Sequence, residues 1–388
     1  MRKIILLYIL FIIGTRVSAQ SFSFNQGEFV ENDYFIELPY QKIKGKIIVD
    51  VQINNQLLKF ILDTGAPTAV SKELSKNLGL EILSNEDITD INRNKVEFEI
   101  ARINELKIGK LSIINIPAVV FEEKLITECF KVDGLIGSNL LRNSVIQFDD
   151  KNNLIRISSN IDNLDVSKAK VSEIFIDKQS SPILKIQLGE RATEMLLFDT
   201  GDDILYSMAY TNMKKFKKTK TFSKLSESYG STSIGINGLE KKSKKYRLSI
   251  PELTIQDAMI KNVVSETTTS TNSRIGCRLL QYGLFTVDYK NSKSYFEPYS
   301  KVMVSKELFW EVNPTFIDDQ LVIGRIWTKE FKNLSVGDRI ISINDINVEN
   351  ISKCDFLSNS PLSNIQTAIL TVENSKGNIL SIDIQKNN

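Results

Sequence analysis

The chain has 388 residues, 42% of them hydrophobic and 25% charged, and it contains no histidine. The missing imidazole excludes Ser-His-Asp and Cys-His nucleophilic systems and zinc sites of the HExxH type. Any acid–base chemistry must therefore use Asp, Glu, Lys, Tyr or Cys. With 49 basic and 47 acidic residues the formal net charge is +2, which is too balanced for a nucleic-acid-binding protein.

The first 19 residues have the pattern of a secretory signal peptide. Arg2 and Lys3 precede an apolar stretch at residues 4–13, and Val17-Ser18-Ala19 offers a small-residue cleavage site. The apolar stretch is shorter than the ~20 residues of a membrane-spanning helix, which makes an uncleaved anchor the weaker interpretation. We expect an exported protein, periplasmic, in the cell envelope or secreted, with no transmembrane span after cleavage.

The three cysteines, Cys129, Cys277 and Cys354, are few and widely separated. This is not the pattern of a disulfide framework, so we expect them to be buried as small hydrophobic side chains. They form no metal-binding motif with each other or with Asp. We expect neither a metal nor another cofactor.

An internal repeat divides most of the chain into two copies. Residues 60–65 read Phe-Ile-Leu-Asp-Thr-Gly, and residues 196–201 read Leu-Leu-Phe-Asp-Thr-Gly, 136 positions later. Three further pairs of similar segments follow in the same order: 105–108 with 252–255, 135–141 with 274–280, and 148–152 with 287–291. Four landmarks in one order indicate a duplication.

Both copies are predicted to be mainly β. Residues 46–53 alternate in polarity and end at Asn54-Asn55, which predicts a strand and a hairpin turn. Helical signals are short: Ser71 is a candidate N-cap for two turns of helix that end at Gly79. The Thr/Ser-rich segment 266–273 is predicted to be a surface loop inside the second copy.

Residues beyond about 300 repeat neither copy. They contain further alternating segments at 320–327, 339–346, 368–373 and 379–384, which predict a third, smaller β-rich domain. We expect a signal peptide at 1–19, a leader or added edge strand at 20–35, lobe 1 at 36–165, lobe 2 at 166–299 and a C-terminal domain at 300–388.

The two Asp-Thr-Gly segments are the candidate catalytic turns. The alternative for each is an ordinary Asp/Gly turn that ends a strand, but both follow apolar strands at equivalent places in the repeat. Two duplicated lobes can bring Asp63 and Asp199 together about an approximate two-fold axis. Two adjacent carboxyls share one proton, so one can activate water while the other donates to a carbonyl. Such a pair supports peptide hydrolysis without histidine or metal.

The motifs resemble those of the retropepsin and pepsin-like aspartic proteases. The resemblance rests on Asp63-Thr64-Gly65-Ala66 with Ile136-Gly137, and on Asp199-Thr200-Gly201 with Ile275-Gly276. It covers about residues 36–299 and implies a bilobal acid-protease β-barrel fold in one chain. It also implies that Asp63 and Asp199 are the catalytic pair, that Thr64, Gly65, Thr200 and Gly201 support the catalytic turns, and that each Ile-Gly motif packs beneath its own turn.

The second copy departs from this family pattern at three positions. Asp202 follows Gly201 where Ser, Thr or Ala is usual, Asp203 adds a second carboxylate next to it, and Arg274 precedes Ile275 where an apolar residue is usual. If either added carboxylate points at the catalytic pair, the pKa values of the pair should rise. If both point to solvent, nothing changes.

A mobile flap is expected between each catalytic turn and its Ile-Gly motif. The candidate in lobe 2 is residues 229–238, which contain Gly230, Gly235 and Gly238; an ordinary long loop is the alternative. Residues 92–99 occupy the same interval in lobe 1 and lack glycine. The lysine-rich segments 214–224 and 241–245 are interpreted as solvated surface, with attraction to an anionic envelope surface or an acidic substrate as the alternative.

The C-terminal domain resembles a PDZ domain. The segment Val336-Gly337-Asp338-Arg339-Ile340-Ile341-Ser342-Ile343-Asn344 is similar to the turn and strand typical of that family. The resemblance implies a domain that adds an extended peptide to a sheet edge. The usual glycine of a carboxylate-binding loop is not evident near Leu308-Phe309-Trp310, so a structural or regulatory domain is the alternative.

Together these patterns predict an exported aspartic endopeptidase with an Asp63/Asp199 pair. We expect a polypeptide substrate in the cleft between the lobes, a peptide ligand of the PDZ-like domain, no nucleic-acid partner and a monomeric catalytic unit. The alternative is a catalytically impaired peptide-binding or scaffolding protein on a protease fold, suggested by Asp202, Asp203 and Arg274.

Overall fold

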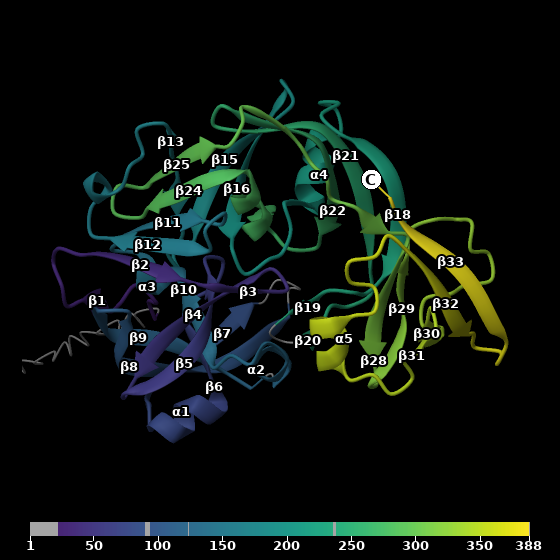
Figure 1. Ribbon diagram of the computed structural model, residues 1–388, viewed down its shortest axis with the longest axis horizontal. Coiled ribbons are helices and arrows are strands. Elements are labelled where there is room, and N and C mark those ends of the chain that lie inside the picture. Colours follow the sequence, from purple (N-terminus) through teal and green to yellow (C-terminus); the bar gives the residue numbers. More distant parts are fainter. Residues whose placement is uncertain (1–21, 90–93, 123, 236–237, 388) are drawn as a thin grey trace, which may run out of the picture.

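The structure is a computed structural model that describes residues 22–89, 94–122, 124–235 and 238–387. The predicted signal peptide lies outside the described residues. Two β lobes lie one above the other in Figure 1, and a third β domain flanks them on one side. Within the described ranges, no helix is long and apolar enough to cross a membrane.

Lobe 1 is built on a nine-stranded sheet in the order β1-β9-β6-β10-β5-β4-β8-β7, with β3 paired to β4. The strands are β1 (Glu28–Phe29), β3 (Gln41–Ile43), β4 (Lys46–Ile53), β5 (Gln56–Asp63), β6 (Ala69–Ser71), β7 (Glu81–Thr89), β8 (Lys95–Ile108), β9 (Leu111–Phe121) and β10 (Gly134–Gly137). The predicted hairpin turn at Asn54-Asn55 is confirmed, because both residues have positive φ and join the antiparallel pair β4–β5.

Lobe 2 has a sheet of the same size in the order β14-β15-β16-β23-β17-β22-β21-β18, with β26 paired to β22. Its strands are β14 (Phe175–Ile176), β15 (Pro182–Leu188), β16 (Ala192–Asp199), β17 (Tyr206–Ala209), β18 (Ser223–Gly230), β21 (Ser243–Ile255), β22 (Ala258–Thr268), β23 (Arg274–Gly276) and β26 (Val302–Val304). A two-stranded hairpin, β19 (Ile234–Gly235) and β20 (Gly238–Leu239), lies between β18 and β21 in the chain.

A six-stranded sheet joins the two lobes in the order β13-β25-β24-β11-β12-β2. Its strands are β2 (Phe35–Pro39), β11 (Val145–Asp149), β12 (Leu154–Ser158), β13 (Lys170–Glu173), β24 (Gly283–Asp288) and β25 (Lys293–Pro298). At its centre β11 of lobe 1 pairs antiparallel with β24 of lobe 2, so that Phe148 faces Phe285. The two copies of the repeat therefore meet strand to strand.

The two copies of the repeat share the same turn at the end of each central strand. Asp149 accepts hydrogen bonds from the backbone and side-chain amides of Asn152 at 3.3 and 2.9 Å. Asp288 accepts the same pair from Asn291 at 3.0 and 2.8 Å. The fourth landmark of the repeat is thus a pair of buried aspartates that close equivalent turns.

The C-terminal domain has a seven-stranded sheet in the order β27-β33-β32-β30-β29-β28, with β31 paired to β30. The strands are β27 (Phe309–Trp310), β28 (Val312–Ile317), β29 (Gln320–Ile326), β30 (Arg339–Ile343), β31 (Ile346–Asn347), β32 (Thr367–Glu373) and β33 (Ile379–Asn387). Strands form in all four segments predicted in this region, although a turn at residues 344–345 divides 339–346 between β30 and β31. The domain has its own hydrophobic core, whereas one larger core runs through both lobes and the sheet between them.

Helices are short throughout the described part of the chain: α1 (Lys72–Leu78), α2 (Lys124–Phe130), α3 (Ser138–Leu141), α4 (Tyr210–Phe216), α5 (Lys353–Asn359) and the 3₁₀ turns at Ile161–Asn163 and Cys277–Tyr282. The predicted caps of α1 are confirmed. The Ser71 hydroxyl accepts from the Leu74 amide, and Gly79 ends the helix in the left-handed conformation. The fold is mainly β and bilobal, as predicted.

Two expectations about polar segments are wrong in part. Residues 266–268 continue β22, and Ser273 is fully buried, where its hydroxyl accepts from the Ala209 amide, so the surface loop is limited to residues 269–272, of which Thr271 and Asn272 are exposed. Lys245, at the end of the second lysine-rich segment, is also buried, because it forms an ion pair with Glu240. The other lysines of both segments are exposed.

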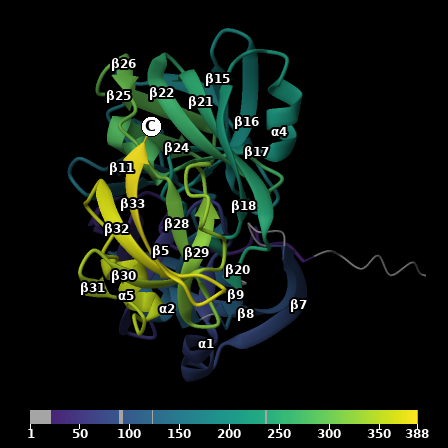
Figure 2. The ribbon, with the colours of Figure 1, turned by 90° about the vertical axis from the view of Figure 1, so that its right-hand side faces the viewer.

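The expectation for the cysteines is wrong for two of the three. Cys129 on α2 and Cys354 on α5 form a disulfide across 225 residues of chain, while Cys277 is free and buried as expected. A pair so far apart in sequence gives no spacing signal, because its proximity arises only when lobe 1 packs beside the C-terminal domain. Figure 2 shows α2 and α5 side by side at that contact.

Candidate active site

Asp63 and Asp199 are the last residues of equivalent strands, β5 and β16. In lobe 1, β10 runs parallel to β5 and places Gly137 beside Asp63. In lobe 2, β23 runs parallel to β16 and places Gly276 beside Asp199. Each Ile-Gly motif therefore lies next to its own Asp-Thr-Gly turn, and Ile136 and Ile275 are fully buried there.

The two turns are joined through their threonines. The Thr64 hydroxyl donates to the Phe198 carbonyl at 2.7 Å and accepts from the Thr200 amide at 3.0 Å. The Thr200 hydroxyl donates to the Leu62 carbonyl at 2.8 Å and accepts from the Thr64 amide at 3.0 Å. Both threonines are fully buried. These four reciprocal hydrogen bonds fix the turns against each other across the interface between the lobes.

The glycines that follow allow the carboxyls to meet. A Cβ atom added to Gly65 would lie 2.4 Å from Cγ of Asp199, and one added to Gly201 would lie 2.3 Å from Oδ2 of Asp63. Each carboxyl thus lies over the opposite turn, where a side chain at the glycine would displace it. Gly65 and Gly201 also donate their amides to Asp63 and Asp199 at 2.9 and 3.0 Å, and the two carboxyls are hydrogen-bonded to each other.

This environment favours a shared proton. Burial raises the pKa of Asp63, an effect that the Lys46 charge opposes. Burial and the neighbouring Asp63 charge raise the pKa of Asp199 to about 7. Because the first carboxylate to ionise disfavours ionisation of the second, the pair holds one proton over an intermediate pH range.

Two cations limit this increase in pKa. Arg274 lies with Nε 3.1 Å from Oδ2 of Asp199, in an ion pair whose N–H bond is not aligned with the carboxylate. Lys46, from β4 of lobe 1, donates to the Gly201 carbonyl of lobe 2. Arg274 stood out in the sequence as a departure from the family pattern. Lys46 gave no such signal, because its proximity to the opposite catalytic turn depends on how the lobes dock.

The two extra carboxyls of lobe 2 differ in their surroundings. Asp202 is partly buried near the pair, and burial together with the Asp199 charge raises the pKa of Asp202 to about 6. Asp203 turns to Arg278, whose Nε and Nη2 atoms donate to it at 3.0 and 3.1 Å. Only Asp202 therefore adds negative charge beside the pair.

The candidate flap of lobe 2 lies at the end of the β18–β21 hairpin. Gly230 ends β18, and Gly235 and Gly238 belong to the β19–β20 hairpin; residues 236 and 237 lie outside the described residues. In lobe 1 the corresponding hairpin pairs β7 with β8, and residues 95–99 begin β8; residues 90–93, which lie between the two strands in the chain, are outside the described residues. A flap role for these residues remains a prediction.

The geometry suits acid–base chemistry on a polar bond. An ionised carboxylate can accept a proton from water while the protonated partner donates to a carbonyl oxygen. No group of three or more Cys, Asp or Glu side chains in the described ranges is arranged to hold a metal ion. The candidate site therefore consists of Asp63 and Asp199, the Thr and Gly residues of their turns, and the cations Lys46 and Arg274.

Comparisons with known proteins agree with this site over lobe 1. Residues 49–143 match the family model described as gag-polyprotein putative aspartyl protease, and this span contains both Asp63 and Ile136-Gly137. A crystal structure of a retropepsin-like aspartic protease from Rickettsia conorii is 23% identical, covering 34% of this chain and 93% of its own, with a TM-score of 0.24. Basic 7S globulin from soybean is 11% identical, covering 68% of this chain and 95% of its own, with a TM-score of 0.40.

Comparison with the curated proteins finds no match. The family match and the paired carboxyls support the same coarse assignment. Over residues 49–143 the chain is similar to the aspartyl protease family, and both the family match and the paired carboxyls point to a peptidase fold.

Proposed function

We propose that this protein is an aspartic endopeptidase that hydrolyses peptide bonds with the Asp63/Asp199 pair. One observation carries the proposal: two hydrogen-bonded carboxyls are held on turns that the Thr64 and Thr200 hydroxyls lock together. The ionised carboxyl takes a proton from water as the oxygen attacks the peptide carbonyl, and the protonated carboxyl donates to the carbonyl oxygen. Return of a proton to the amine then releases the two products.

The substrate is an extended polypeptide that lies between the lobes, and the catalytic unit is a monomer because one chain supplies both carboxyls. We also propose that the protein is exported. The apolar N-terminal segment supports this, and so does the Cys129–Cys354 disulfide, because disulfides persist in oxidising compartments.

For the C-terminal domain we propose a PDZ-like, peptide-binding role. Its edge strand β28 and helix α5 border a cavity of about 780 Å³, which is also lined by Leu125 of lobe 1 and Leu239 of lobe 2. An edge strand beside a helix is the arrangement in which an extended peptide adds to a sheet. Phe316 of β28 and Phe356 of α5 contact each other edge to face, with ring centroids 5.7 Å apart.

Substitution of either carboxyl tests the catalytic proposal. Asp63→Asn and Asp199→Asn should each abolish cleavage of a peptide library, read by mass spectrometry across pH 3–8, because an amide cannot exchange the shared proton. The thermal midpoint should stay near that of the wild type, since Asn has the shape of a protonated Asp. Asp203→Asn is the matched control, because Asp203 contacts Arg278 rather than the pair, and it should retain cleavage. Hydrolysis that survives in either Asn variant contradicts the mechanism.

A second candidate is a non-catalytic peptide-binding protein on the same fold. The Arg274–Asp199 ion pair favours it, because a fixed cation beside one carboxyl competes with the shared proton. The same library separates the two candidates. Peptides that are retained but uncut at every pH support the binding protein, and cut peptides support the protease.

A further inference from the structure

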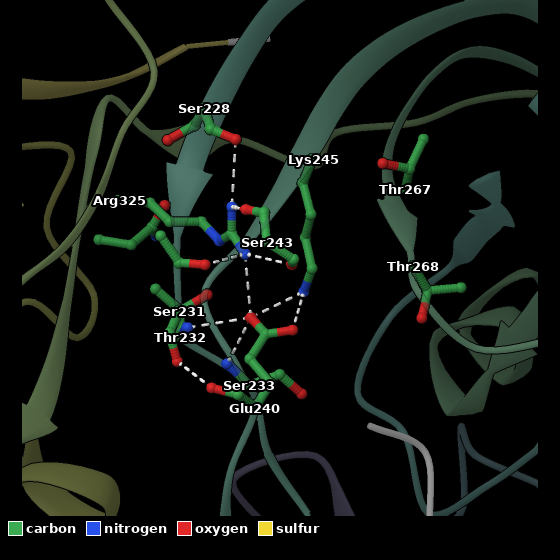
Figure 3. A network of polar contacts seen from close by, with 12 residues as sticks. Ser228, Ser231, Thr232, Ser233, Glu240, Ser243, Lys245, Thr267, Thr268 and Arg325 are labelled. Atoms are coloured by element: carbon green, nitrogen blue, oxygen red, sulfur yellow. Dashed lines mark hydrogen bonds and ion pairs between the residues drawn. The ribbon is translucent and has the colours of Figure 1, made fainter. Parts of the chain in front are cut away.

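The C-terminal domain forms hydrogen bonds with the end of the β18–β21 hairpin of lobe 2. Arg325 on β29 is fully buried, and its guanidinium donates to three backbone carbonyls of the hairpin, those of Gly230 at 2.6 Å, Ser243 at 2.9 Å and Ser228 at 3.3 Å. Figure 3 shows these contacts converging on one side chain. An arginine presents several donors in a rigid fork, so it fixes the relative position of the two hairpin strands as well as attracting them.

A buried carboxylate completes the contact. Glu240, between β20 and β21, lies 3.2 Å from Nη2 of Arg325 and 2.8 Å from Nζ of Lys245. It also accepts the amides of Thr232 and Ser233 at 3.0 and 3.2 Å. Burial raises the pKa of Glu240, but the Lys245 charge and these hydrogen bonds outweigh burial, so its pKa is lowered. Glu240 therefore links the hairpin backbone at Thr232 and Ser233 to the guanidinium of Arg325, as drawn in Figure 3.

The backbones themselves are in direct contact. The Ser231 amide donates to the Gly324 carbonyl at 3.1 Å, and the Ile326 amide donates to the Ser228 hydroxyl at 3.2 Å. A Cβ atom added to Gly230 would lie 2.0 Å from the Gly324 carbonyl oxygen, and the three nearest atoms it would meet all belong to Gly324 or Arg325. The glycine that suggested a mobile tip is thus needed for close packing on another domain.

The hairpin also extends towards lobe 1. Gly238 and Leu239 line the cavity of about 780 Å³ together with Leu125 and Glu128 of α2. The C-terminal domain is joined to α2 by the Cys129–Cys354 disulfide. It therefore contacts the hairpin of one lobe while it is covalently bound to the other.

We propose that the C-terminal domain is a clamp that sets the position of the lobe 2 hairpin between the lobes, with Arg325 as its positioning residue. A fully buried cation loses favourable hydration unless polar groups replace it, and here the hairpin supplies most of those groups. The hairpin is therefore held in one position while the domain is in place. This inference rests on the proposed function for its effect on peptide cleavage, since a hairpin fixed over an extended substrate contributes to substrate binding.

Hydrogen exchange and kinetics test the clamp in the full-length protein. Arg325→Met removes the fork but keeps much of the volume, and Gly230→Ala leaves every charge in place while forcing the backbones apart. Both variants should speed amide exchange in residues 228–233 by about tenfold or more, because the local opening free energy falls. Both should raise KM for a cleaved peptide by about fivefold or more with kcat within about twofold, because a binding contact is lost.

Arg339→Met is the matched control. Arg339 lies in the same domain, and in the described part of the chain it forms ion pairs with Glu349 and Glu373, which belong to that domain as well. This variant should leave exchange at 228–233 and KM unchanged. If exchange in 228–233 stays at the wild-type rate in both Arg325→Met and Gly230→Ala, there is no clamp. If exchange rises but KM does not, the hairpin has no role in substrate binding.

The exchange measurement does not require activity. Absence of cleavage in every sample would reject the proposed protease function and leave the clamp to be decided by exchange alone. Faster exchange throughout lobe 2 and the C-terminal domain, rather than at the hairpin, would show that Arg325 only stabilises the fold, and it would overturn the positioning role.

Discussion

Arg274 gives Asp199 a neighbour that Asp63 lacks. The guanidinium is buried, with Nε 3.1 Å from the Asp199 carboxylate, and its charge lowers the pKa of both carboxyls against the larger effect of burial. The active form of the pair carries one proton, so activity requires a pH above the first ionisation and below the second. We expect the second ionisation near pH 7, because the pKa of Asp199 is raised to about 7.

The pH dependence of kcat/KM should follow this arrangement. Activity should fall as pH rises through about 7, because the pair then loses its remaining proton. Arg274→Met removes a positive charge that favours ionisation, so the alkaline midpoint should move up by about one to two pH units. Arg274→Lys keeps the charge and should move it less. An unchanged midpoint in Arg274→Met would mean that this charge does not act on the pair.

The sequence predicted the two candidate catalytic aspartates of this site but not the cations that surround them. Asp63 and Asp199 were found because each follows an apolar strand at an equivalent place in the repeat. Lys46 and Arg325 were not, since a lone lysine or arginine in a strand is typical of exposed surface and only docking of separate domains buries its contacts. Arg274 was recognised as unusual, but its position beside the carboxylate depends on the parallel pairing of β23 with β16.

At the scale of elements, β5 and β16 depend on each other through their turns. Each threonine hydroxyl donates to a backbone carbonyl in the strand that ends at the opposite lobe's Asp, so neither turn is complete alone. The repeat predicted both strands and both turns. It could not predict this exchange of hydrogen bonds, because nothing in either copy indicates the distance between them.

Removing one hydroxyl should weaken the whole interface. Thr64→Val leaves the Phe198 carbonyl and the Thr200 amide without this partner in a buried site, which should cost about 2–4 kcal/mol of unfolding free energy. Thr200→Val should cost a similar amount. The double variant should lose less than the sum, because the first loss already loosens the turns. Urea unfolding measures all three, with Thr64→Ser, which keeps the hydroxyl, as the control. Strict additivity would show that the two turns are energetically independent.

At the scale of the molecule, three β units form one connected body. The sheet β13-β25-β24-β11-β12-β2 joins the lobes, Arg325 fastens the C-terminal domain to lobe 2, and a disulfide fastens it to lobe 1. The sequence predicted two β units from the two copies of the repeat, and a third from the residues beyond about 300 that repeat neither copy. It did not predict their connections, which link residues that are far apart in the chain and carry no shared motif.

The disulfide should contribute measurably to stability. Cys129→Ser with Cys354→Ser should lower the unfolding free energy by about 2–5 kcal/mol, because a cross-link over a long stretch of chain restricts the unfolded state. Alkylation of the denatured protein checks the pairing directly. Without reductant only Cys277 should be modified, and after reduction all three cysteines should be. Modification of three cysteines without reductant would contradict the disulfide.

The duplicated lobes within a single chain have a consequence for how the site can change over evolutionary time. Had the two-fold arrangement been assembled from two copies of a shorter chain, every substitution would appear twice and the carboxyls would remain equivalent. Here Leu135 and Arg274 hold matching positions before the two Ile-Gly motifs, one apolar and one charged. Because one chain encodes both halves, a substitution can occur in one half alone, and each aspartate can be given its own surroundings, as Arg274 gives Asp199.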